Sequence, residues 1–266
     1  MGAACGGSED KPVDVPDAGE IVSDASVTDD AGTETDPGIP GNDAGISGED
    51  AGSHGGTIEF TEGTFTDQRD NNTYKTISME ILGAAFTLTA ENMRYAGSDA
   101  SGAPLTYHSA NGNSANDAVF GLLYDRDTAV NDVCPPGWRV PTSNEVYYFI
   151  KYVNDTVGGG AEMLFNALAA QSSAWTCASN AINNASGFGA LPAGQWDLAY
   201  ESGSQYMYFG ERAHFWTSTY EEGKYNTFSI DNLKFNDSCA EPSRAFFLAY
   251  ARCETALSVR CLREDN

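Results

Sequence analysis

Residues 134–149 read CPPGWRVPTSNEVYYF, and this stretch decides how the rest of the chain folds. Its two adjacent prolines and its glycine exclude a regular element at the start, and the third proline biases the residue before it toward an extended backbone. Thr142 or Ser143 can then cap a helix, with Glu145 returning the second hydrogen bond of a capping box. The stretch therefore predicts a rigid corner that starts a helix ending near Val153.

An apolar stripe with helical spacing follows the corner and supports this helix. A second helix is predicted over residues 161–170, after three glycines that end the first. Alternation of apolar and polar residues predicts an opening hairpin over residues 58–79. Further short strands are predicted over residues 205–209, 214–219, 226–233, 245–250 and 257–262. Helices followed by antiparallel strands are typical of an α+β domain.

The first 57 residues differ in composition from the rest of the chain. They contain thirteen acidic residues, one basic residue and no aromatic residue. Such a segment cannot bury enough apolar surface to offset its ordering entropy, so we expect residues 1–57 to be a disordered acidic tether. All thirty aromatic side chains lie from Phe60 onward, which predicts one folded domain over residues 58–266.

The formal net charge of −24 also restricts the partners. Nucleic-acid binding needs clustered Lys and Arg side chains that displace counterions from phosphates, and the sequence has no such cluster. We therefore expect no nucleic-acid partner. No apolar run approaches the roughly 18 to 20 residues that span a bilayer.

The N-terminal sequence GAACGGS, residues 2–8, resembles the end of a bacterial lipoprotein signal. The resemblance implies that Cys5 carries a lipid, which would be the only membrane contact. It further implies an outer-membrane or cell-surface location. The alternative is a stray cysteine in the tether.

The spacing of the five later cysteines matches no zinc pattern, so we expect disulfides formed in an oxidising compartment. Five cysteines cannot all pair within the domain. We predict one bond between Cys134 and Cys261, a second between Cys239 and Cys253, and a free Cys177. The first bond closes a long loop and would contribute about 4 to 5 kcal/mol by the chain-entropy model.

Three aromatic residues, Trp196, Tyr206 and Tyr208, are candidates for ligand binding, because exposed aromatic faces can stack on polysaccharide. Trp196 is the strongest, since it lies in a glycine-rich stretch. The alternative is that these rings fill the core or anchor loops. Of the histidines, none has zinc-ligand spacing, and His214 is expected to be packed.

Two acidic turns are candidates for calcium binding, because calcium prefers carboxylate and amide oxygens. The first turn supplies Asp67, Asp70 and Asn72, and the second supplies Asp125 and Asp127. Asp and Asn side chains also cap turns without any metal, which is the alternative.

Six blocks of the domain resemble, in order, the Fibrobacter succinogenes major paralogous domain. The blocks are FTDxRD at 65–70 with YKTI at 74–77, AENM at 90–93, CPxGWRVPT at 134–142, GFxALPAG at 187–194, FWTS at 215–218 and SVRC at 258–261. This family is known chiefly as an extracellular module. The resemblance implies a non-enzymatic binding or adhesion module that recognises a polysaccharide or a surface protein.

The element GWRxPTxxE at 137–145 is also similar to that of formylglycine-generating-enzyme-type domains. Those domains have a C-type-lectin-like fold, so the similarity implies two helices and a small antiparallel sheet. It leaves two alternatives to the binding module: a secreted lectin-fold oxidase, which would need an oxidisable thiol pair including Cys177, and a structural surface-layer component.

Overall fold

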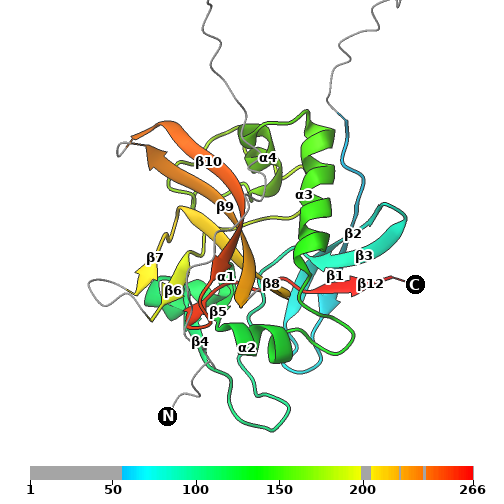
Figure 1. Cartoon of the computed structure of the whole chain (residues 1–266), viewed down its shortest axis with the longest axis vertical. Helices are drawn as coiled ribbons and strands as arrows, with labels where there is room; N and C mark the ends of the chain where they lie inside the picture. Colours follow the sequence, from blue (N-terminus) through cyan, green and yellow to red (C-terminus); the bar gives the residue numbers. More distant parts are fainter. Residues whose placement is uncertain (1–55, 199–204, 222, 236–237, 266) are drawn as a thin grey trace, which may run out of the picture. The chain divides into compact units, whose positions relative to one another are not determined.

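The structure, a computed structural model, describes residues 56–198, 205–221, 223–235 and 238–265. The predictions for Cys5 and for the acidic tether concern residues outside these ranges. The described residues form an α+β domain in which two longer helices pack against small antiparallel sheets (Figure 1). In this part of the chain, no helix has the length and apolar character needed to cross a bilayer.

The first sheet is antiparallel and has the strand order β1-β2-β3-β12. Its strands are β1 (Thr61–Thr66), β2 (Thr73–Ile81), β3 (Ala84–Thr89) and β12 (Leu262–Glu264). The predicted opening hairpin is confirmed as the pairing of β1 with β2. Because β12 pairs with β3, with Leu262 opposite Leu88, this sheet joins the two ends of the domain.

The second sheet is longer and has the order β10-β9-β8. Its strands are β8 (Arg212–Glu221), β9 (Lys224–Phe235) and β10 (Ser238–Ala251). They contain the predicted strands 214–219, 226–233 and 245–250. The predicted strand 257–262 is wrong, because these residues do not pair along a single neighbouring strand. Leu257, Ser258 and Leu262 instead make isolated bridges to Tyr124, Phe215 and Arg139, respectively.

Two small sheets complete the strands. One has the order β11-β6-β7, from β11 (Thr255–Ala256), β6 (Gln195–Asp197) and β7 (Tyr206–Met207), and the other pairs β4 (Tyr107–Ser109) with β5 (Leu122–Tyr124). The strand predicted over 205–209 is shorter than expected. Tyr208 interrupts it by adopting a left-handed backbone with φ of 59°.

Both predicted helices are present. α3 (Ser143–Val157) begins at the Thr142 cap, and both hydrogen bonds of the capping box with Glu145 are formed. α4 (Ala161–Leu168) follows the three glycines. Shorter turns also occur: α1 (Asp117–Phe120), α2 (Arg126–Thr128), the 3-10 turns η1 (Ala110–Gly112) and η2 (Ser114–Asn116), and the π turn η3 (Ala129–Val133).

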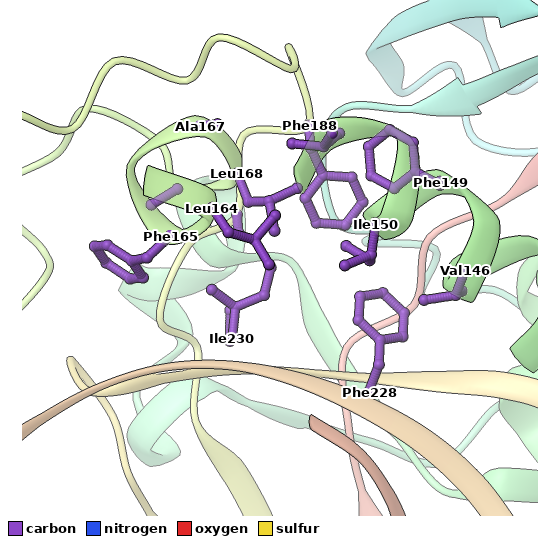
Figure 2. Close-up of a cluster of buried hydrophobic side chains, with 14 of the residues drawn as sticks. Val146, Phe149, Ile150, Leu164, Phe165, Ala167, Leu168, Phe188, Phe228 and Ile230 are labelled. Carbon is purple, nitrogen blue, oxygen red and sulfur yellow. The ribbon is translucent and has the colours of Figure 1, made fainter. Parts of the chain in front are cut away.

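The largest core cluster lies between these two helices and β9. Figure 2 shows Val146 and Ile150 of α3 and Leu164 of α4 directed toward Phe228 and Ile230 of β9. All five side chains are buried. The stripe seen in the sequence is therefore the face by which α3 packs on the second sheet.

Two disulfides are found among the described residues. The predicted Cys134–Cys261 bond is present, with the Cα atoms 5.7 Å apart. The other predictions are wrong, because Cys177 is not free but bonds to Cys239. Cys239 and Cys253 lie at opposite ends of β10, a 14-residue strand that at about 3.3 Å per residue separates them by roughly 40 Å. Disulfides of this kind indicate an extracytoplasmic protein.

Candidate functional site

The three candidate aromatic residues lie close together on and beside the small β11-β6-β7 sheet. Trp196 of β6 pairs across the strands with Tyr206 of β7, and Tyr208 follows at the end of β7. His108 of β4 joins them from a distant part of the sequence. We call His108, Trp196, Tyr206 and Tyr208 the aromatic patch.

His108 stacks flat on Trp196, with ring centroids 3.8 Å apart and an interplanar angle of 14°. The Tyr206 ring meets the imidazole edge-on, at 6.5 Å and 74°. Burial lowers the pKa of His108 below its usual value, against an opposing effect of Asp125. The imidazole is therefore neutral near pH 7 and covers one face of the indole.

Tyr206 is positioned by Gly112 of η1. Gly112 has φ of +66°, and a Cβ atom there would lie 3.0 Å from the tyrosine ring. A side chain at this position would therefore have to displace the ring. The close approach of backbone to ring fixes one side of the patch.

Tyr208 is the most exposed member, with 39% of its surface accessible. The Arg212 guanidinium lies over its ring, 4.2 Å from the centroid. Arg212 is itself held by Asp231, which accepts from Nε at 2.9 Å and from Nη2 at 2.6 Å. Burial raises the pKa of Asp231, although Arg212 acts to lower it. This anchored guanidinium holds the ring at the surface.

A buried histidine of β8 links β6 to β9 through polar contacts. His214 of β8 has only 6% of its surface exposed, and its Nδ1 lies 2.9 Å from Gln195 Oε1. Its Nε2 lies 3.0 Å from Thr227 Oγ1. Because Oε1 only accepts, Nδ1 carries a proton. Burial, with a smaller effect of Arg212, lowers the pKa of His214 to about 3. His214 is packed, as expected.

The calcium hypothesis is not supported at the first acidic turn. Asp67 is fully buried, and both of its oxygens accept from Arg69. Arg69 also donates to the carbonyl oxygens of Asp132 and Val133 and lies 3.7 Å from the centroid of the Tyr95 ring. The Arg69 guanidinium thus already neutralises the Asp67 carboxylate and ties this turn to residues 132 and 133.

The remaining candidate calcium ligands also have other roles. Asp70 accepts from the backbone and side chain of Asn72, which closes a turn. Asp125 caps α2 by accepting from Thr128. Asp127 points to solvent beside Arg126. Within the described ranges, no group of three acidic, histidine or cysteine side chains is placed to hold a metal ion.

A shallow recess of about 250 Å³ lies at the corner, lined by Gly137, Trp138, Arg139, Leu262 and Glu264. The Arg139 guanidinium in it already donates to Glu145 and Glu264. Although burial acts to raise the pKa of Glu145, hydrogen bonds from Arg139 and Thr142 hold it below its usual value. The guanidinium of the recess is thus already bound by two carboxylates.

Three of the six blocks that resemble the family meet at one buried arginine. Arg260 Nε donates to Asn92 Oδ1 at 2.7 Å, and its other nitrogens donate to the carbonyl oxygens of Thr89, Phe188 and Gly189. Burial lowers its pKa to about 9. These block residues hold the fold together and do not form the aromatic patch.

The sequence did not identify His108 and Arg212 as members of the site. Both act through contacts with residues at least four positions away, His108 with Trp196 and Arg212 with Tyr208. The one local signal is Gly112, since a glycine close to His108 allows an aromatic ring to approach the backbone.

Comparison with known proteins gives one match. The sequence model of the Fibrobacter succinogenes major domain matches residues 87–263, which contain the aromatic patch, Arg260 and both described disulfides. No curated protein and no solved structure matches the chain. The chain belongs to the Fibrobacter succinogenes major domain family.

Proposed function

We propose that the domain is a non-enzymatic binding module that acts outside the cytoplasm and contacts a polysaccharide through the aromatic patch. The observation that carries the proposal is that His108, from a distant segment, stacks on Trp196 beside Tyr206, with Tyr208 two residues further along the chain. Aromatic rings that are half-exposed and held in place can stack on the apolar face of a sugar ring with little loss of entropy.

The patch is built to keep its rings in position. Trp196 is held by His108 on one face, and Tyr208 by the Arg212–Asp231 pair. Tyr208 also has a positive φ, a conformation that costs a tyrosine of the order of 1 kcal/mol and is kept only where the surroundings stabilise it. Such preorganisation favours a role in binding over one in filling space.

We further propose a C-type-lectin-like fold and attachment to the cell surface through Cys5. The two helices, the small antiparallel sheets and the pairing of β12 with β3 are consistent with that fold. The acidic segment before the domain would then separate the patch from the membrane surface.

The oxidase alternative has less support. It needs a reactive thiol pair, whereas Cys177 is bonded to Cys239 and no cysteine in the described ranges is free. A structural surface-layer component, the other alternative, would not require an exposed, oriented Tyr208. An envelope protein is the other class of partner, and failure of the chain to bind any polysaccharide would favour it.

The test is affinity electrophoresis of the full chain through gels containing soluble polysaccharides, together with a glycan array. Tyr208→Asn removes the ring and keeps a residue that tolerates a positive φ. The matched control is Tyr148→Asn, which removes an exposed tyrosine from α3. We expect about tenfold weaker retention for Tyr208→Asn and no change for the control. Failure of the wild-type chain to bind any polysaccharide, or equal loss in both variants, would exclude this site.

A further inference from the structure

The sheet edges of the domain are not equally protected. The β8 edge of the second sheet is bridged by Gly194 and Ser258, and β12 of the first sheet is followed by charged residues and bridged by Arg139. The edge strand β1 is short and contains Glu62, a charge that discourages pairing. These edges are therefore blocked or unsuited to further pairing.

β10 differs from these edges. It is 14 residues long, and in the described ranges its backbone pairs with β9 alone. Residues 245–251, AFFLAYA, contain no charged side chain. In Figure 1, β10 is the orange strand at the margin of the second sheet. Because the first half of β10 contains Glu241, Pro242 and Arg244, the edge suited to another strand is the uncharged segment 245–251, with its alternate N–H and C=O groups.

Apolar side chains continue along this edge beyond the core. Phe246 packs against Phe228, with ring centroids 6.2 Å apart. Leu248 and Tyr250 follow on the same face, because side chains of a strand alternate, and they are 46% and 56% exposed. An added strand would cover them and extend the core.

Unpaired positive charges lie near the ends of the same edge. Eight of the thirteen lysines and arginines of the domain form ion pairs with described carboxylates. The other five are Lys75, Lys224, Lys234, Arg252 and Arg260, and three of these, Lys224, Lys234 and Arg252, lie at or beyond the ends of the β9–β10 pair. Lys224 lies opposite Arg252 by extension of the β9–β10 register, and its Nζ is 4.8 Å from the Tyr250 ring centroid. Lys234 stands near the other end of β9. Cations thus stand near both ends of the β9–β10 pair, with Glu221 of β8 opposite Lys224 at one of them.

We propose that β10 binds an extended, acidic segment of another protein, which adds to the second sheet as a strand. The backbone groups of the edge require an extended polypeptide, and its apolar face requires alternating apolar residues. The cations near its ends require carboxylates in the bound segment. A second copy of this domain meets the charge requirement poorly, because it would bring the same cations to the same edge.

The probe is a fluorescein-labelled synthetic peptide in which valine and threonine alternate and two glutamates stand at each end. Its binding to the full chain is measured by fluorescence anisotropy, and hydrogen exchange locates the protected amides. We expect saturable binding, weakened by salt, with new protection of residues 245–251. A peptide with lysines in place of the glutamates, and one with a central proline, should bind at least tenfold more weakly.

Matched variants test whether the peptide binds at the β10 edge. Leu248→Asn should weaken peptide binding about tenfold, whereas Leu82→Asn, which removes an exposed leucine from the β2–β3 turn, should not change it. Lys224→Gln should reduce the salt dependence of peptide binding, and Lys75→Gln should leave that dependence unchanged. The proposal is overturned if no acidic peptide binds, or if bound peptide leaves 245–251 unprotected. It is also overturned if this segment is already protected without peptide, because the chain itself or a second copy would then occupy the edge.

Discussion

Acidification should destabilise the domain through His214, the imidazole buried between Gln195 and Thr227. Its pKa in the folded state is about 3, because burial disfavours the charged form. In the unfolded chain the pKa returns to about 6.5. A folded-state pKa below the unfolded value means that the contribution to stability is complete above pH 6.5 and is lost as the pH falls toward 3.

The size of this effect follows from the two pKa values. Between pH 7 and pH 5 the unfolded state gains a proton at this position that the folded state does not accept. The resulting loss is about 2 kcal/mol in the free energy of unfolding, a large fraction of the stability of an ordinary domain. His108, whose pKa is also lowered, acts in the same direction, while the raised pKa of Asp231 acts in the opposite one.

Urea unfolding at pH 7, 6 and 5 measures this directly, with wild type compared with His214→Gln. The variant should be less stable at pH 7 by about 1 to 3 kcal/mol, since it loses buried hydrogen bonds. Its stability should nevertheless fall by about 2 kcal/mol less than wild type on going to pH 5. His108→Gln is the matched control, because it replaces a histidine that is half-buried instead of fully buried. If wild type and His214→Gln lose the same stability, the buried neutral imidazole is refuted.

Three further predictions concern the framework. Replacing both Cys134 and Cys261 with serine should lower the free energy of unfolding by about 5 kcal/mol, as read from denaturant midpoints, and reduction of the wild-type chain should give a loss no smaller. Arg260→Met should cost at least about 3 kcal/mol, because it leaves several buried acceptors unpaired; a change below about 1 kcal/mol in the same assay would contradict this network. Arg69→Met should lower the melting temperature by leaving the Asp67 carboxylate buried without its partner, whereas calcium or a chelator should not shift that of the wild type; a calcium-dependent rise would restore the metal hypothesis.

Local features of the fold were accessible from the sequence because they depend on neighbouring residues. The capping box needs Thr142 and Glu145 three positions apart, and the helix after it needs only its apolar periodicity. The α+β class followed from the order of such elements. The aromatic candidates were also visible, since Trp196 and Tyr206 stand on either side of one short hairpin.

Apart from the predicted Cys134–Cys261 bond, the tertiary structure decided which distant groups meet. It placed Cys177 beside Cys239 and kept Cys253 at the far end of β10, because a strand is rigid and long. It placed His108 on Trp196 and set the Arg69 guanidinium between the Asp67 carboxylate and the carbonyl oxygens of Asp132 and Val133. Residue spacing along a chain specifies neighbours within a turn or a helix, but contacts across the domain depend on how the elements pack, and packing is a property of the whole core.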